Sequence, residues 1–287
     1  MRWRMGRRST NIEDRRGVRL GGRGAAGGGI GLLIILVIAV LLGADPVKLL
    51  SDISSTGVDQ SSYYEQQPVS EEDRELADFV SVVLADTEDT WTEIFAEYNG
   101  AYREPTLVLF SGAVESACGY AQSAVGPFYC PEDQKVYIDL SFYRDLKNRY
   151  NAPGDFAQAY VIAHEVGHHV QNLMGVLQRV QQAQRAARSE AESNNLQVRV
   201  ELQADCFAGV WAFHTQQRHN FINERDVQGA LQTAAAIGDD MLQRRSQGQV
   251  VPDSFTHGSS EQRQRWFMTG LRSGQVAACN TFRAQQL

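Results

Sequence analysis

The pattern His-Glu-Val-Gly-His at residues 164–168 is the part of this chain best suited to chemistry. It continues an apolar run, residues 159–163, that is typical of the first turns of a buried helix. Because residues four apart lie on one face of a helix, His164 and His168 point to the same place, where one Zn²⁺ can be held. Glu165 lies beside that place and can accept a proton from a water that the metal activates. A pair of structural core histidines is the alternative interpretation.

A catalytic zinc takes three protein ligands and keeps a fourth position open. The best candidate for the third ligand is Glu201, in the segment Glu-Leu-Gln-Ala-Asp at 201–205. Glu201 and Asp205 share a helix face, so one can bind the metal while the other accepts the free N–H of a ligating histidine. A solvated polar stripe is the alternative. The apolar residues around the two acids argue against it, since an unpaired buried carboxylate is costly.

Two motifs resemble those of a known family. His-Glu-Val-Gly-His-His-Val-Gln at 164–171 and Glu-Leu-Gln-Ala-Asp-Cys at 201–206 resemble the bacterial neutral zinc metallopeptidases of the YpfJ type, and more distantly the HtpX and Ste24 zincins. The resemblance covers roughly residues 30–285, and other stretches that carry it are 118–119, 126–131, 136–139 and 256–263. It implies a gluzincin-like site in which Zn²⁺ is held by His164, His168 and Glu201, with Glu165 as the base and Asp205 behind the ligands.

A further donor for the reaction is expected C-terminal to the metal ligands. Peptide hydrolysis passes through a tetrahedral oxyanion, which an additional hydrogen-bond donor stabilises. Gluzincin-like sites often place a His, Tyr or Arg there, and His257, in a small-residue loop after the turn at 251–253, fits that description. Arg263 is the reserve candidate. A surface or helix-capping role for His257 is the alternative. His169 points to another face of the helix than His168, which favours a structural role.

The N-terminal part predicts a membrane anchor. Residues 1–29 hold eight arginines against two acidic residues, and residues 27–44 are 18 positions without a charge. That length can just cross a bilayer as a helix, and the positive-inside rule keeps the arginines in the cytoplasm. We therefore expect a single-pass protein of the bacterial inner membrane, anchored through residues 30–44, with its C-terminal domain on the extracytoplasmic side. A long signal peptide that is cleaved is the alternative.

The net charge and the four cysteines limit the kinds of protein and site that the chain can form. The formal net charge is −7 in spite of the arginine-rich start, so the rest of the chain is acidic and nucleic acid is not an expected partner. Four cysteines lie beyond the expected anchor, where disulfides form readily. They allow three pairings, of which we favour Cys118–Cys130, which closes a short loop, together with Cys206–Cys279. Cysteine ligation of zinc is the alternative, and the spacing fits no zinc pattern.

The remaining chain predicts one mostly helical α+β domain with a small sheet, preceded by the transmembrane helix, and the resemblance implies that this domain is of the zincin type. Residues 45–70 resemble a polar linker, and residues 71–287 are long enough for a single domain. Strands are expected at 106–111 and 135–139. Helices are expected at 71–98, around the metal motif, and at 175–194, 226–243 and 260–273.

Two of these elements bear on the cleft. In zincins the strand before the metal helix commonly pairs with an extended peptide, and residues 135–139 would be that edge strand; an ordinary core strand is an equally good interpretation. The glutamine-rich turns of residues 175–194 indicate a solvated face rather than a binding surface.

The function predicted from these residues is that of a membrane-anchored zinc endopeptidase acting on peptides or proteins. A non-catalytic envelope scaffold that keeps the zinc for stability is the first alternative, but a scaffold has no use for Glu165. A zinc amidase that acts on cell-wall peptides is the second, because such sites activate water in the same way.

Overall fold

A four-stranded sheet forms the platform beside which the helices pack. The computed structural model describes residues 1–16, 70–123, 126–148 and 154–287. The strand order is β1 (Ile12–Asp14), β2 (Thr106–Phe110), β6 (Lys135–Asp139) and β5 (Phe128–Cys130). The first three strands are parallel and β5 runs antiparallel to β6. In β2 and β6 every residue after the first is buried, as expected for inner strands that are covered on both faces.

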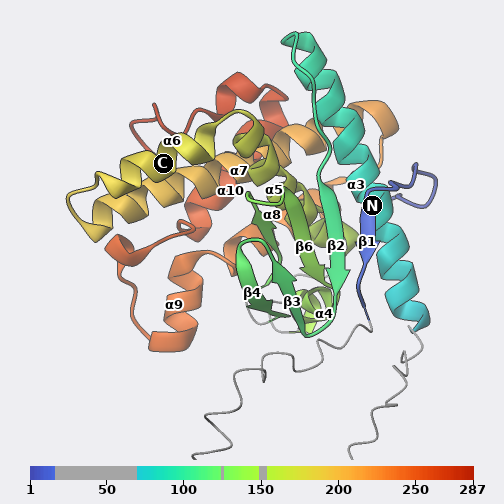
Figure 1. The fold of residues 1–287 in the computed structure, drawn as a ribbon, viewed down its shortest axis with the longest axis horizontal. Helices are drawn as coiled ribbons and strands as arrows, with labels where there is room; N and C mark the ends of the chain where they lie inside the picture. The colour runs from blue at the N-terminus through green and yellow to red at the C-terminus, as the bar shows by residue number, and fades with distance from the viewer. Residues whose placement is uncertain (17–69, 124–125, 149–153) are drawn as a thin grey trace, which may run out of the picture. The chain divides into compact units, whose positions relative to one another are not determined.

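The helices carry most of the core (Figure 1). They are α3 (Glu71–Glu97), α4 (Ser141–Asn148), α5 (Asp155–Leu173), α6 (Val176–Arg185), α7 (Glu190–His219), α8 (Glu224–Ala236), α9 (Asp239–Gln247) and α10 (Ser260–Ser273). Short 3-10 turns are present at η3 (Pro252–Ser254) and η4 (Val276–Cys279). A mostly helical α+β fold with small sheets was predicted, and the structure confirms it.

Small residues let α10 lie directly against α7. A Cβ atom on Gly270 would come within 1.9 Å of the Cys206 main-chain oxygen, and one on Gly209 within 2.1 Å of the Phe267 oxygen. No side chain fits between the two helices at these points. The disulfide Cys206–Cys279 then ties α7 to the turn η4 that follows α10.

A second small sheet lies next to the platform. It is the hairpin β3 (Ala113–Ser116) and β4 (Gly119–Gln122), with antiparallel pairing. The disulfide Cys118–Cys130 joins the turn of this hairpin to the end of β5. Both disulfides favoured from the sequence are present in the structure.

The first sixteen residues of the arginine-rich start pack with the rest of the domain. Residues 1–16 belong to the same compact unit as residues 69–287, and β1 pairs with β2. Figure 1 shows β1 beside β2 and close to α3. Trp3 is buried in the main core, Arg7 pairs with Glu88 at 2.9 Å, and Arg8 pairs with Asp78 at 2.7 Å. Residues 1–16, which the sequence analysis placed in an arginine-rich cytoplasmic start, thus pack with the domain expected to begin at residue 71, and acidic side chains of α3 pair with Arg7 and Arg8.

The predicted anchor, residues 30–44, and the linker, residues 45–70, lie outside the described residues except for Ser70, the N-cap of α3. Among the described residues, no helix combines the length and the apolar composition that a bilayer span requires.

Two predicted helices are each divided. Residues 175–194 hold all of α6 and the start of α7, with a break at residues 186–189. Residues 226–243 divide into α8 and α9 at Gly238, where a Cβ atom would lie 2.5 Å from the Ser260 nitrogen. The chain turns there because the backbone passes close to the start of α10.

Candidate metal centre

The first two candidate ligands come from the middle of α5. Val161, Ile162, Ala163 and Val166 bury this helix, so its histidine face is held against the protein and not in solvent. The rings of His164 and His168 lie 4.8 Å apart between centroids, as the four-residue spacing predicts. Both side chains border a cavity of about 770 Å³. The helix therefore presents two imidazoles to one point on the cavity wall.

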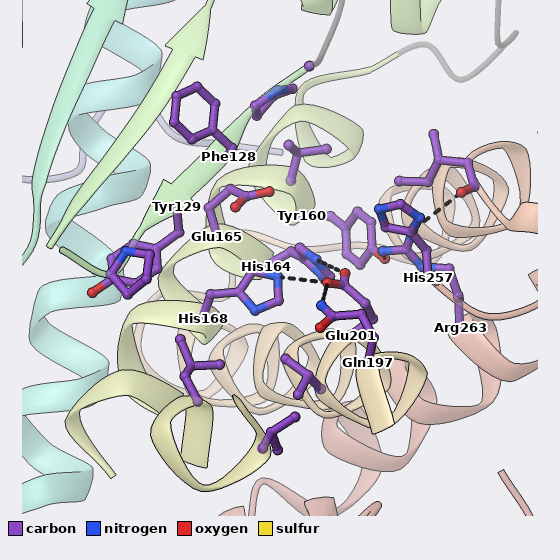
Figure 2. Close-up of a pocket in the computed structure, with 18 of the residues that line it drawn as sticks. Phe128, Tyr129, Tyr160, His164, Glu165, His168, Gln197, Glu201, His257 and Arg263 are labelled. Atoms are coloured by element: carbon purple, nitrogen blue, oxygen red, sulfur yellow. Dashed lines mark hydrogen bonds and ion pairs between the residues drawn. The ribbon is translucent and has the colours of Figure 1, made fainter. Parts of the chain in front are cut away.

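The third candidate ligand reaches that point because α5 and α7 approach closely. A Cβ atom on Gly167 would lie 3.1 Å from the Ala204 backbone, so glycine permits the close approach of the helices. Glu201 then lies 3.2 Å from Nε2 of His164 and 3.6 Å from Nε2 of His168. Figure 2 shows the three side chains pointing toward one another.

The three side chains suit zinc. One donor atom from each of His164, His168 and Glu201 can be chosen so that all lie within 4.8 Å of one another. Tetrahedral nitrogen and oxygen ligands, each about 2 Å from the ion, are about 3–4 Å apart, and two imidazoles with one carboxylate are a common catalytic zinc set. The residues present therefore fit the metal. Zn²⁺ is the cofactor that the donor set and the family described below both indicate.

The other ring nitrogens are fixed by partners away from the metal position. His164 Nδ1 lies 2.9 Å from Asp205 Oδ1, and His168 Nδ1 lies 2.9 Å from Gln171 Oε1. Gln171 in turn donates to the Val200 oxygen at 2.7 Å. These contacts favour the proton on each Nδ1, which leaves each Nε2 lone pair free for a cation. Asp205 thus lies where the sequence predicted it, and Gln171 is a partner that the sequence analysis did not identify.

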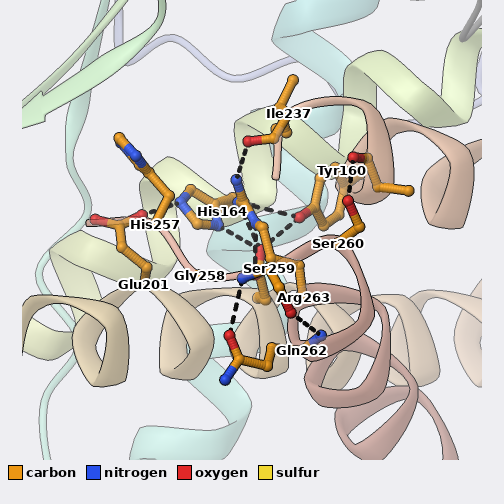
Figure 3. A network of polar contacts seen from close by, with 12 residues as sticks. Tyr160, His164, Glu201, Ile237, His257, Gly258, Ser259, Ser260, Gln262 and Arg263 are labelled. Atoms are coloured by element: carbon orange, nitrogen blue, oxygen red, sulfur yellow. Dashed lines mark hydrogen bonds and ion pairs between the residues drawn. The ribbon is translucent and has the colours of Figure 1, made fainter. Parts of the chain in front are cut away.

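Asp205 is itself held by a buried cation. Arg263 donates to it through Nε and Nη2, both at 2.9 Å, and the Tyr160 hydroxyl donates to the same carboxylate. Asp205 is 0% exposed and Arg263 is 2% exposed. Figure 3 shows Arg263 next to His164 and Tyr160. The guanidinium uses two of its nitrogens to hold Asp205, so Arg263 positions the carboxylate behind His164.

The charged groups of the site favour the binding of a cation. Burial disfavours the protonated form of His164, but Asp205 and Glu201 outweigh it and raise its pKa to about 10. Burial also opposes ionisation of Glu201, yet the imidazoles of His168 and His164 hold its pKa well below the usual range. Arg263 and His164 likewise lower the pKa of Asp205 to about 2 against the effect of burial. Glu201 and Asp205 thus remain ionised at neutral pH. Their negative charge favours either protonation of the histidines or binding of a metal ion.

Glu165 lies beside the three ligands. Its side chain borders the same cavity although the residue is only 7% exposed. Figure 2 shows it between Phe128 and His164, on the cavity side of α5. It lies next to the metal position, where a general base can reach a water molecule.

His257 reaches the cavity from the loop before α10. Its side chain is 51% exposed and borders the cavity that contains the three ligands. Asp239, the first residue of α9, contacts His257 Nδ1 at 3.2 Å and accepts main-chain hydrogen bonds from residues 256–258. The hydrogen bond to Asp239 raises the pKa of His257, and the Glu201 carboxylate contributes to the shift. The sequence analysis did not identify Asp239. The only signal for it was its position at the start of a helix, directly after Gly238.

The strand next to the cavity is β5. The expected edge, residues 135–139, is β6, which lies between β2 and β5 and pairs with β5 through residues 135–137. Phe128 and Tyr129 of β5 border the cavity instead. His169 ties this strand to α5, since its Nδ1 lies 3.0 Å from the Tyr129 hydroxyl. Its structural role agrees with the direction in which the sequence placed it.

Comparison with known proteins identifies the family to which the chain belongs. A sequence model of the family described as "Putative neutral zinc metallopeptidase" matches residues 1–282. "Uncharacterized protein YpfJ" of Escherichia coli K12 is 50% identical over 290 residues, covering 98% of this chain and 99% of the relative. "Uncharacterized protein Rv2575" of Mycobacterium tuberculosis H37Rv is 40% identical over 269 residues, covering 87% and 86%. No solved structure matches. The chain thus belongs to the neutral zinc metallopeptidase family that its motifs resemble.

Proposed function

We propose that this protein is a zinc-dependent endopeptidase of the HExxH-plus-glutamate type. In this proposal His164, His168 and Glu201 hold the metal, and Glu165 is the general base. The observation that carries the proposal is the placement of an ionisable side chain, Glu165, inside the cavity next to three convergent ligands. A zinc site that serves only to stabilise a fold is closed by a fourth protein ligand and needs no neighbouring base.

Each residue of the site has a separate role in the proposed hydrolysis. Bound zinc supplies Lewis acidity, which polarises the peptide carbonyl and makes a water molecule more acidic. Glu165 accepts a proton from the attacking water and later delivers it to the leaving amine. In this proposal His257, whose Nδ1 contacts Asp239, donates a hydrogen bond to the oxyanion. Asp205 keeps His164 in the tautomer that presents Nε2.

The lining of the cavity supports an endopeptidase rather than an exopeptidase. Among the described residues that border it, every acidic or basic side chain belongs to the metal centre or its partners. Arg263 borders the cavity, but both its Nε and its Nη2 are used by Asp205. The described lining of the cavity therefore offers no charge outside the metal centre and its partners to recognise the free amine or carboxylate at the end of a peptide.

We also propose that the domain works outside the cytoplasm. Two disulfides, Cys118–Cys130 and Cys206–Cys279, join segments near the cavity and the helix that carries Glu201. Disulfides of this kind persist in oxidising compartments and are rare in the cytosol.

The test of the proposed activity is the variant Glu165→Gln in the full chain. We expect zinc content close to that of the native protein and a loss of peptide cleavage of about 10²–10⁴-fold, because a general base is lost while the ligands remain. Glu261→Gln is the matched control, since it removes an equivalent carboxylate that is 81% exposed on α10. Cleavage by Glu165→Gln at the native rate contradicts the role of the base.

A further inference from the structure

One face of α6 borders the cavity. Leu177, Val180, Gln181 and Gln184 all line it, and their spacing of three, four and seven residues places them on a single helix face. The helix begins immediately after α5, since only Met174 and Gly175 separate the two. Gly175 takes a φ of 69°, which allows this abrupt turn. The glutamine-rich face expected to be solvated therefore lines the cavity of the metal centre.

The wall that this face forms is apolar next to the metal ligands. Val200, which precedes the ligand Glu201 on α7, also lines the cavity. Val180 and Val200 belong to a small buried cluster, against which Leu177 packs while remaining partly exposed. Apolar surface is thus available within one residue of a metal ligand.

Two amides of this wall, those of Gln184 and Gln197, are held by hydrogen bonds. Gln197 donates to the Glu201 carboxylate at 3.1 Å, and Gln184 donates to the Gln197 side chain at 3.3 Å. Gln184 also donates to the Ser193 oxygen at 3.3 Å. The amides join α6 to the metal ligand and bring no charge. Arg179 of α6 borders a different cavity, so its guanidinium does not serve this wall.

We propose that the wall made by Leu177, Val180 and Val200 is a specificity pocket for an apolar side chain, of leucine or phenylalanine type, adjacent to the bond that is cleaved. The proposal rests on the endopeptidase function above and adds its substrate class. An apolar side chain buries its surface against the three residues. A charged side chain at the same position loses its hydration and finds no opposite charge on the described wall.

Binding of peptide hydroxamates to the zinc-loaded full chain tests the proposal without requiring turnover. The probes are otherwise identical and carry leucine, alanine, glutamate or lysine next to the zinc-binding group, and calorimetry measures Kd. We expect leucine to bind at least tenfold more tightly than alanine, because a difference of one methylene in an apolar pocket already changes binding about 10–200-fold. We expect glutamate and lysine to bind more weakly than alanine. Equal Kd values, or a preference for a charged side chain, overturn the proposal.

Two matched variants test whether this wall determines the preference for leucine over alanine. Leu177→Ala removes apolar surface from the cavity and should reduce the preference for leucine over alanine several-fold. Leu196→Ala removes the same atoms from the same cluster, but Leu196 borders the other cavity and should leave the preference unchanged. Leu177→Arg should reverse the order so that glutamate binds more tightly than leucine. Equal effects of Leu177→Ala and Leu196→Ala overturn the assignment.

The two proposals fail in different ways. If no hydroxamate binds, the metal centre and the specificity pocket are both wrong. If all hydroxamates bind alike, the metal centre remains and only the pocket is wrong. The measurements on the native chain do not depend on whether any variant folds.

Discussion

Replacing Asp205 with asparagine should destabilise the protein far more than the loss of one charge on its surface. The substitution leaves the guanidinium of Arg263, which is 2% exposed, without its carboxylate partner. Breaking a buried ion pair by removing one partner costs about 3–5 kcal/mol. For a domain of this size that corresponds to a fall in Tm of about 6–20 °C. The same change replaces the charged acceptor of the His164 N–H with a neutral amide oxygen, so zinc affinity should fall about 10–100-fold.

Denaturant unfolding of the full chain, with zinc removed and with zinc added, separates the two effects. The zinc-free protein reports the cost of removing the carboxylate from Arg263 and His164, and a competitive chelator titration reports the change in zinc affinity. Glu261→Gln breaks an exposed pair with Arg265 and should cost no more than about 1 kcal/mol.

A double substitution shows whether the cost comes from the orphaned charge. Asp205→Asn combined with Arg263→Met removes both charges, so its cost should fall below the sum of the two single costs by about 2 kcal/mol or more. The reasoning is refuted if the single costs add within about 0.5 kcal/mol, or if Asp205→Asn costs as little as the surface control.

Four further results are expected. Chelation of zinc should lower Tm, and zinc at about 1,000 times its Kd should restore about 4 kcal/mol; an unchanged Tm argues against the ligand set. His257→Ala should reduce turnover about 10²–10³-fold with unchanged zinc content, and full turnover removes His257 from the mechanism. The protein isolated without reductant should show no free thiol after denaturation, because its cysteines are paired, and labelling of all four would contradict both disulfides. Burial lowers the pKa of His169 to about 4, so the unfolded chain takes up a proton that the folded state refuses. The free energy of unfolding should therefore fall as the pH drops from about 6.5 to 4, and His169→Gln should flatten this part of the profile.

The local parts of the site could be predicted because helix periodicity is a short-range property. The four-residue spacings of His164 with His168, and of Glu201 with Asp205, place each pair on one face whatever the rest of the fold does. The strands at 106–111 and 135–139 were likewise expected from their β-branched and aromatic runs, and β2 and β6 confirm them. Cysteine number and loop length led to the correct disulfides.

Features that depend on distant pairings did not show in the sequence. β1 is only three residues long, and its partner β2 begins more than 90 residues later, so neither length nor alternation marked it. The cavity-facing side of α6 was predicted to be solvated, since a glutamine-rich face has the same composition whether it meets water or a cavity. The hydrogen bond from Arg263 to Asp205 also joins residues that are 58 positions apart in the sequence, so no local pattern indicated it.

The location of β1 has a practical consequence for anyone preparing the peptidase domain. Cutting the chain before residue 70, in order to discard an expected membrane segment, would also discard β1 and Trp3. The freed edge of β2 would then expose unpaired N–H and C=O groups next to a hole in the core, a state prone to aggregation. Arg16 donates to the Asp73 oxygen at 2.7 Å, so the two ends that flank residues 17–69 lie within reach of each other. Replacing only that internal stretch with a short glycine–serine bridge would keep the strand and the fold together.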